Sequence, residues 1–389
     1  MRRTRIVCIS DTHNQTPKLP PGDVLIHAGD LTNQGSYSEL KKTVEWLERA
    51  DFEAKIVVAG NHDITLDESF YHEHGNSWRW PQPQDPALCR MLLTESKSIT
   101  YLENEATTVR LASPKGPGTC FTVFGSPCTP KHWNWAFQYE PQHAESVWGK
   151  IPSGVDVVVT HTPPQNHCDG AAEDERSGCP VLLTRLGAVR PMLNICGHIH
   201  AGRGVERVRW RTTPGHDESL EEAVEHWTDP GIGNKKLSLL DLTSKSGRAL
   251  GSVKPQTRQR RPDSLEEEYG SLPDAFQRLN DRAGQPASGD QNLIPTSSLT
   301  KVALYEDKAL WGKEPGSAVR APSDIGRDEA AIDCKGPERS LPMAVEQRSE
   351  TVVINAALLG PRVAGRAIGV NKPIVVDVEL PVWQSFHGE

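Results

Sequence analysis

The chain has 389 residues, of which 36% are hydrophobic, and it contains 32 glycines and 30 prolines. This length is long for one domain, and the composition indicates a core of ordinary size that carries much loop or unstructured sequence. The formal net charge of -8 argues against duplex nucleic acid or an anionic membrane as a partner. A small phosphate ester is not excluded, because bound metal ions would supply positive charge locally.

We expect neither a secretory signal nor a membrane-spanning segment from this sequence. The apolar run Ile6–Ile9 ends at Ser10 and is too short for the core of a signal peptide, and no apolar stretch is long enough to cross a bilayer. The eight cysteines are scattered and form no C-x-x-C pair. We therefore expect reduced thiols, a cytoplasmic location and no zinc–thiolate site.

Short apolar runs alternate with amphipathic stretches over the first two hundred residues, which is typical of an α/β fold. The runs predict strands over Arg5–Ser10, Val24–His27, Lys55–Ala59, Thr119–Gly125, Val155–Thr160 and Met192–Cys196. A helix is predicted to begin at Ser36, because Ser36 and Glu39 have the spacing of a capping box. A second helix is predicted over Pro180–Val189, where the apolar residues fall on one face.

The composition changes near Trp210 and becomes rich in Glu, Arg, Ser, Pro and Gly. Within this region only Lys236–Leu242 and Ser298–Tyr305 have the pattern of ordered segments. We therefore predict a polar, largely disordered insertion over residues 211–350.

Regular patterning returns in the last part of the chain. Two strands are predicted, one over Thr351–Leu359 and one over Pro373–Leu380. The core is accordingly expected in two parts, residues 1–210 and residues 351–383, separated in sequence by the insertion.

Five of the predicted strands are followed at once by Asp, Asn or His. The motifs, in chain order, are Asp11-Thr12-His13, Gly29-Asp30, Gly60-Asn61-His62, Thr160-His161 and Gly197-His198-Ile199-His200. Each motif alone is compatible with an ordinary turn. Because ligands bind at the carboxyl ends of strands in α/β sheets, the series together predicts one shared site.

The residue types suit a pair of cations. Asp11 and His13 are two residues apart, so both side chains can reach one cation from an extended segment. A carboxylate such as Asp30 can bridge two cations about 3.5–4 Å apart. Asn61 offers a neutral carbonyl oxygen, and His62 beside it is left free to act on a substrate.

In this order the motifs resemble those of the calcineurin-like metallophosphoesterase superfamily. The resemblance implies an α/β fold, a four-layer α/β/β/α sandwich, here with a long low-complexity insertion before the last strands. It implies a first metal held by Asp11, His13, Asp30 and His200. It implies a second metal held by Asp30, Asn61, His161 and His198. His62 would be the catalytic histidine that does not bind metal.

This ligand set and this resemblance lead to an expected chemistry. Oxygen and imidazole ligands suit Mn, Fe, Zn or Ni, and Mn is favoured. Two such cations lower the pKa of a bridging water, which gives hydroxide for attack on phosphorus. We expect a phosphoric ester hydrolase, foremost a phosphodiesterase for a small or cyclic-nucleotide-type substrate. A phosphomonoesterase for a small metabolite and a low-activity nucleotide-binding scaffold remain as alternatives.

Further motifs resemble one subfamily, the small metallophosphoesterase-domain-containing proteins of the fetal-brain type. These motifs are Gly125-Ser126-Pro127, Trp135-Ala136-Phe137 and the run that begins at Cys196. In that subfamily an I-N-A strand and a final P-I-V-type strand follow soon afterwards. Here Ile354-Asn355-Ala356 and Pro373–Asp377 match them but lie far downstream, so the insertion is the main departure, and it resembles fungal members.

Two further departures bear on the activity. Ser/Thr protein phosphatases of the superfamily carry Asp and Arg shortly after the Gly-Asp motif, whereas this chain continues from Asp30 with Leu31 to Gly35. A protein-phosphatase role is therefore disfavoured. Asp63 also stands after the catalytic-type histidine where many relatives have Glu.

Overall fold

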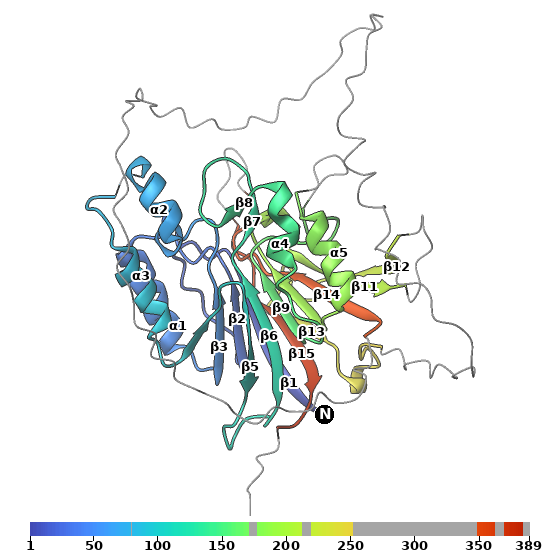
Figure 1. Ribbon diagram of the computed structural model, residues 1–389. Helices are drawn as coiled ribbons and strands as arrows, with labels where there is room; N and C mark the ends of the chain where they lie inside the picture. Colours follow the sequence, from blue (N-terminus) through green and yellow to red (C-terminus); the bar gives the residue numbers. More distant parts are fainter. Residues whose placement is uncertain (79, 171–176, 212–218, 252–347, 362–368, 384–389) are drawn as a thin grey trace, which may run out of the picture. The chain divides into compact units, whose positions relative to one another are not determined.

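The computed structural model describes residues 1–78, 80–170, 177–211, 219–251, 348–361 and 369–383. All of these belong to one compact unit, which comprises residues 1–255 and 342–389. The fold is described here for that unit (Figure 1).

One sheet has six strands in the order β13-β15-β1-β2-β3-β4. Their bounds are β1 (Arg2–Ile9), β2 (Val24–Ala28), β3 (Ala54–Val58), β4 (Ile99–Tyr101), β13 (Ser238–Asp241) and β15 (Ile374–Leu380). The strands β1, β2, β3 and β4 run parallel to one another, and β15 runs antiparallel to β1. Three successive parallel strands therefore deliver their carboxyl ends to the same edge of this sheet.

The second sheet has seven strands in the order β12-β11-β14-β10-β9-β6-β5. Their bounds are β5 (Glu105–Arg110), β6 (Cys120–Ser126), β9 (Val157–Thr160), β10 (Leu193–Cys196), β11 (Gly204–Trp210), β12 (Glu221–His226) and β14 (Glu350–Asn355). The strands β6, β9, β10 and β14 are parallel. A separate pair, β7 (Thr129–Pro130) and β8 (Gln138–Tyr139), forms a small ribbon.

The helices connect these strands and cover the sheets. The α-helices are α1 (Tyr37–Arg49), α2 (Glu68–His74), α3 (Pro86–Thr94), α4 (Ala144–Trp148) and α5 (Pro180–Val189). Short 3-10 turns are η1 (Ile64–Leu66), η2 (Gly75–Ser77), η3 (Pro141–His143), η4 (His200–Gly202) and η5 (Ser244–Ser246). In the described ranges, every helix is too short or too polar to span a bilayer.

Three apolar clusters define a four-layer arrangement. The largest lies between the two sheets and includes Ile6, Ile26 and Val159. A second packs α1 and α3 against the outer face of the six-stranded sheet, and a third packs α4 and α5 against the outer face of the seven-stranded sheet. The predicted α/β/β/α sandwich is confirmed, and it explains why the strands read as continuous apolar runs: both of their faces are buried.

The predicted regular elements are largely confirmed. All six strands predicted in the first two hundred residues are present, with ends shifted by up to three residues. Ser36 caps α1 with the reciprocal bonds to Glu39 of a capping box, and α5 has the predicted bounds. The sequence patterns did not reveal the helices α2, α3 and α4 or the strands β4, β5, β7, β8 and β11. Most of those elements are short or partly exposed, so their periodic apolar signal is weak.

The core extends beyond residue 210, where the insertion was predicted to begin. The described residues 219–251 contain β12 at the edge of one sheet and β13 at the edge of the other. β13 lies within Lys236–Leu242, which was predicted to be ordered. β12 has four exposed residues out of six, which makes it read like linker sequence. Most of the predicted insertion, including Ser298–Tyr305, lies outside the described residues, so its disorder stays a prediction.

The last two strands lie inside the sheets and not at their edges. β14 lies between β10 and β11, and β15 lies between β1 and β13, as the red strands among the blue and green ones show (Figure 1). The strand predicted over Thr351–Leu359 is shorter than expected, since it ends at Asn355. The segment after residue 347 is therefore needed to complete both sheets.

We predict that Ile374→Ala lowers the free energy of unfolding by about 2–5 kcal/mol. Ile374 begins β15 and is fully buried between the sheets, so the truncation leaves a cavity there. Ile232→Ala, at a side chain that is 72% exposed, should change stability by less than about 0.5 kcal/mol. Urea unfolding followed by tryptophan fluorescence checks this, and equal midpoints for the two variants would contradict the placement of β15.

Candidate metal centre

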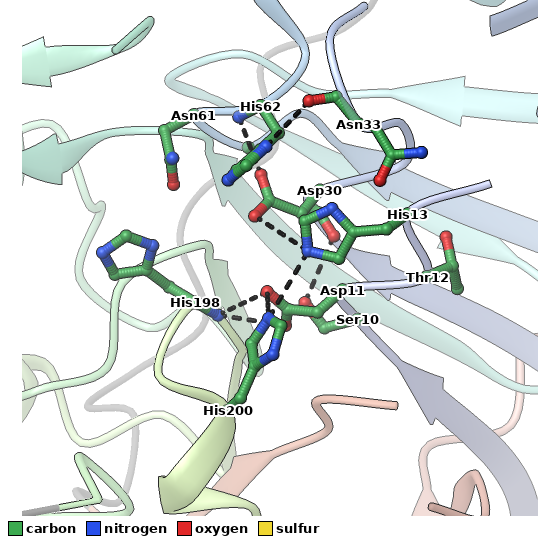
Figure 2. A network of polar contacts seen from close by, with 12 residues as sticks. Ser10, Asp11, Thr12, His13, Asp30, Asn33, Asn61, His62, His198 and His200 are labelled. Carbon is green, nitrogen blue, oxygen red and sulfur yellow. Dashed lines mark hydrogen bonds and ion pairs between the residues drawn. The ribbon is translucent and has the colours of Figure 1, made fainter. Parts of the chain in front are cut away.

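The residues singled out in the sequence gather where the carboxyl edges of the two sheets meet. Strands β1, β2 and β3 lead directly to Asp11, Asp30 and Asn61, and strands β9 and β10 lead to His161 and the segment that carries His198 and His200. Figure 2 shows Asp11, His13, Asp30 and His200 directed toward a common space. All eight predicted site residues are brought into this region.

The ligand-bearing loops have an unusual backbone. Four of the predicted ligands have positive φ angles: Asp11 (52°), His13 (41°), Asp30 (53°) and His198 (66°). A left-handed conformation is unfavourable for residues with a side chain and persists where surrounding contacts hold it. The first two loops hold each other, because Asp11 N–H donates to the Gly29 carbonyl (2.9 Å) and His13 N–H donates to the Asp30 carbonyl (3.1 Å).

Glycine before a ligand lets the loops approach closely. A Cβ atom at Gly29 would lie 2.4 Å from Nδ1 of His161, and one at Gly197 would lie 1.9 Å from Oγ of Ser10 and 2.3 Å from a carboxylate oxygen of Asp11. Real Cβ atoms do not come this close to other atoms. These two glycines therefore bring ligands from different sheets within reach of each other.

A first set of ligand atoms comes from Asp11, His13 and His200, whose candidate atoms lie within 4.8 Å of one another. His200 Nε2 is 3.3 Å from Asp11 Oδ1 and 3.4 Å from His13 Nε2. Asp30 approaches this set, with Oδ2 at 3.6 Å from His13 Nε2. This is the group that the family resemblance assigns to the first metal.

A second set comes from Asp30, His161 and His198, again within 4.8 Å of one another. His161 Nε2 is 3.3 Å from Asp30 Oδ1 and 3.1 Å from Asn61 Oδ1. This is the predicted second group, including its asparagine. Asp30 therefore faces the first set with one carboxylate oxygen and the second set with the other.

Backbone carbonyls orient three of the imidazole rings. Nδ1 of His13 lies 3.1 Å from the Thr32 carbonyl, Nδ1 of His161 lies 2.8 Å from the Ala28 carbonyl, and Nδ1 of His200 lies 3.3 Å from the Gly360 carbonyl. A carbonyl can only accept, so Nδ1 carries the proton in each ring. Nε2 is thereby directed toward the other ligands, as is usual for metal-binding histidines.

The chemistry of this donor set fits cations. At the centre, imidazole nitrogens face carboxylate and amide oxygens, and these are groups that offer lone pairs. The lone pairs repel one another unless a positive charge lies among them, and either a proton or a metal ion can supply that charge. Asp11, Asp30, Asn61 and His161 are each less than 5% exposed, so water screens this repulsion weakly. The residues present therefore fit a pair of divalent metal ions.

The titration behaviour reflects the same crowding. Burial opposes ionisation of Asp11, but the bond to His200 and the charge of His161 lower its pKa to about 2. Burial disfavours a charged His161, yet the carboxylate of Asp30 raises its pKa to about 9. Burial and the neighbouring His161 lower the pKa of His198 to about 3. The carboxylates thus stay ionised and hold positive charge beside them.

His62 lies beside the ligands and is held by several contacts. Its Nδ1 is 2.8 Å from the Asn33 carbonyl, and its backbone N–H donates to Asp30 Oδ1 at 2.9 Å. Its ring meets that of His13 edge-on, with centroids 4.7 Å apart, and lies 4.1 Å from the ring of Trp135. Because Nδ1 donates to Asn33, Nε2 is the nitrogen available for a substrate.

Asp63, whose effect the sequence left open, connects two of the ligand loops. Its buried carboxylate accepts hydrogen bonds from the backbone N–H groups of Leu31, Thr32 and Gly60 and from the Thr32 hydroxyl, at 2.7 to 3.1 Å. Leu31 follows Asp30, and Gly60 precedes Asn61. Asp63 therefore fixes the loop that carries Asp30 against the loop that carries Asn61 and His62.

Some of the residues that shape the site carry little or no sequence signal. The carbonyl groups of Ala28, Thr32, Asn33 and Gly360 orient the histidines, but any residue offers a carbonyl. Trp135 was noted only as part of a motif that marks the subfamily, and the motif did not indicate its contact with His62. Only the folded backbone reveals these partners.

The model of the calcineurin-like phosphoesterase family matches residues 4–202. The chain is 39% identical over 214 residues to Metallophosphoesterase domain-containing protein 1 of Homo sapiens, covering 52% of this chain and 62% of that protein. It is 30% identical over 232 residues to UPF0046 protein C25E10.12 of Caenorhabditis elegans, covering 57% of this chain and 75% of that one. These names agree with the subfamily that the sequence resembles.

A further similarity reaches a protein of a different name. The chain is 41% identical over 225 residues to the probable rhamnogalacturonate lyase C of Emericella nidulans, covering 57% of this chain but only 20% of that protein. The chain thus spans less than two thirds of the length of this relative and of the human one. The lyase name describes that whole protein and carries no argument for this chain.

Solved structures resemble the fold distantly. One is TT1561 of Thermus thermophilus, at 14% identity and a TM-score of 0.33, with 52% of this chain and 84% of that chain covered. Another is the purple acid phosphatase PPD1 of yellow lupin, Lupinus luteus, at 12% identity and a TM-score of 0.30, with 54% and 40% covered. Similarities this low carry no argument about the site.

We predict that Gly197→Ala weakens the binding of divalent metal by at least about tenfold, the scale of a misplaced ligand shell. The new Cβ would displace Asp11 or Ser10 at the distances given above. Gly204→Ala is the matched control, because the nearest heavy atom to its Cβ would be the Gly202 carbonyl oxygen at 3.7 Å. Calorimetric titration with Mn²⁺ measures both variants. Unchanged affinity of Gly197→Ala would contradict the close approach.

Proposed function

The chain belongs to the calcineurin-like phosphoesterase family, and we propose that it is a metal-dependent phosphodiesterase that hydrolyses a small or cyclic-nucleotide-type substrate. The observation that carries this proposal is the position of Asp30 between two sets of ligand atoms, with one carboxylate oxygen toward each set. A carboxylate in that position is what a dinuclear centre requires. Mn²⁺ is the favoured metal, because the ligands are oxygen and imidazole nitrogen.

The proposed ligands divide between two ions. Asp11, His13 and His200 would hold the first ion, and Asn61, His161 and His198 would hold the second, with Asp30 shared. When bound, two divalent ions supply hydroxide at neutral pH and neutralise charge on the phosphoryl oxygens. The protein contributes the fixed rings and the burial that strengthens these interactions.

His62 is proposed as the catalytic histidine. Its backbone and Nδ1 are held by Asp30 and Asn33, so its Nε2 has a defined direction. From there it can donate a proton to the leaving oxygen or bind a phosphoryl oxygen in the transition state.

The substrate and location are parts of the same proposal. A small phosphate ester, including a nucleotide, is the proposed partner. A cytoplasmic location is proposed because the cysteines of the described ranges are free thiols, which a reducing compartment maintains. The alternatives are a phosphomonoesterase and a low-activity nucleotide-binding scaffold. The presence of a ligand side chain at all seven proposed positions supports an enzyme over the scaffold.

We predict that the full-length chain with added Mn²⁺ hydrolyses a bis-aryl phosphate faster than the corresponding mono-aryl phosphate. A chelator should abolish both activities, and returned Mn²⁺ should restore them, because the ions supply the nucleophile. Release of aryl alcohol, followed by absorbance, measures the rates. A preference for the monoester would favour the phosphomonoesterase. Absence of metal-dependent turnover on both substrates would favour the scaffold.

We predict different outcomes for two substitutions in the centre. His62→Ala should lower kcat by about 10²–10⁴-fold, the usual range for an acid–base group, with both metal ions retained. Asp30→Ala should lose both ions, because each would lose a shared ligand. His72→Ala, in α2 with a side chain that is 67% exposed, is the control and should match the wild type.

Elemental analysis of the purified variants, together with their rates, distinguishes these roles. If Asp30→Ala kept two ions per chain, its bridging role would be wrong. If His62→Ala lost metal in proportion to its rate, His62 would be a ligand and not a catalytic residue.

A further inference from the structure

The segment that carries His198 and His200 folds into a strained turn. The N–H group of Ile199 donates to the Gly197 carbonyl at 2.7 Å, and His198 between them has a φ of +66°. A three-residue turn with positive φ at its centre is the rare and strained form of the γ-turn. It persists only where neighbouring groups hold it.

One side of this turn is held by a proposed ligand. The backbone N–H of His198 donates to both carboxylate oxygens of Asp11, at 3.0 and 3.1 Å. This contact holds the N–H group of His198 in place. A carboxylate can only accept hydrogen bonds, so Asp11 cannot bind the carbonyl groups of the turn.

Asn355 holds the other side. It is the last residue of β14 and is fully buried. Its Nδ2 lies 2.9 Å from the Ile199 carbonyl, 3.4 Å from the Gly197 carbonyl and 2.9 Å from the Cys168 carbonyl. Its Oδ1 accepts from the N–H group of Ala357 at 3.0 Å, which fixes the orientation of the amide.

The two carbonyl groups of the turn occupy decisive positions. The Gly197 carbonyl belongs to the peptide group directly before His198, and the Ile199 carbonyl belongs to the one directly before His200. A side chain that holds both peptide groups sets the direction in which both histidines leave the backbone. Without it, each carbonyl group would lose one of its two donors: the Gly197 carbonyl would keep only the Ile199 N–H (2.7 Å), and the Ile199 carbonyl only the Gly202 N–H (2.9 Å). Both remaining donors lie within three residues in sequence, so nothing from β14 would then hold the turn, and it could relax.

The residues that follow Asn355 support the same region. The Gly360 carbonyl lies 3.3 Å from Nδ1 of His200. Ser10, directly before Asp11, donates its N–H to the Ala356 carbonyl (3.0 Å) and accepts from the Leu358 N–H (2.9 Å). The segment 355–360 therefore contacts the loops that carry Asp11, His198 and His200.

We propose that Asn355 is a positioning residue for the metal centre, which holds the turn around His198 so that His198 and His200 face their metal ions. The inference rests on the metal centre of the proposed function. It implies that metal binding depends on Asn355, which comes after residues 252–347 in the sequence, although all the proposed ligands come before residue 252. Supporting partners of metal ligands commonly change metal affinity by about 10–100-fold when they are removed.

The test is calorimetric titration of the chelator-treated, full-length chain with Mn²⁺. Asn355→Ala and Asn355→Ser should each bind Mn²⁺ about 10–100-fold more weakly than the wild type. Their hydrolysis rate should recover when Mn²⁺ is raised in proportion, because the chemistry of the filled site is unchanged. Urea unfolding of the metal-free variants shows separately whether the fold is retained.

Thr351→Val is the matched control on the same strand. Thr351 is also fully buried, and its hydroxyl donates to the Pro191 carbonyl and accepts from Trp210 Nε1, both at 2.8 Å. It lies at the end of β14 away from the ligands. We expect it to cost stability but to keep the Mn²⁺ affinity of the wild type.

Several results would overturn the proposal. Wild-type Mn²⁺ affinity in a folded Asn355→Ala or Asn355→Ser would do so, as would an equal loss of affinity in Thr351→Val. If neither Asn355 variant folded while Thr351→Val did, Asn355 would serve the fold as a whole and not the centre. Binding of Mn²⁺ by the wild type without hydrolysis would refute the proposed function alone.

Discussion

The structure depends on the position of one buried carboxylate, Asp30, between imidazoles from two different sheets. One of its oxygens lies 3.6 Å from His13 Nε2, and the other lies 3.3 Å from His161 Nε2. His13 follows a strand of one sheet and His161 a strand of the other, so both sheets must meet at their carboxyl edges. The apolar core between the sheets brings the two histidines together at this edge. The lone pairs of Asp30 and the two imidazoles converge there and require positive charge between them.

Much of the surrounding structure holds an unfavourable backbone in place. The positive φ angles of Asp11, His13, Asp30 and His198 cost free energy, on the order of 1–3 kcal/mol each. Hydrogen bonds between neighbouring loops, the carboxylate of Asp63 and the amide of Asn355 offset this cost. Glycines before the ligands allow the close approach that these bonds need. The loops of the site therefore constrain one another through these bonds.

The order of strands shows how the end of the chain takes part. β14 and β15 follow residues 252–347 in sequence but lie inside the two sheets. Such distant pairing costs loop-closure entropy, because a long loop must close before the contacts gain free energy. The part-buried ion pair of Arg5 with Asp377 (2.8 Å) connects β15 to β1. Residues 355–360 contact Ser10 after β1 and His200 after β10. The segment that completes both sheets therefore also supports the candidate metal centre.

The sequence alone predicted the α/β class, most of the central strands, the helices α1 and α5, and the set of side chains that gathers at the candidate centre. These follow from local patterns: apolar runs buried on both faces, the capping box at Ser36, and Asp, Asn or His directly after strands. The order of the strands, the membership of β12 and β13 in the sheets, and the roles of Asp63 and Asn355 were decided only by the tertiary structure. The physical reason is that these features depend on backbone carbonyl and N–H groups brought together from distant segments, and every residue type offers such groups. The sequence therefore indicates candidate ligands, whereas only the fold shows which groups hold them in place.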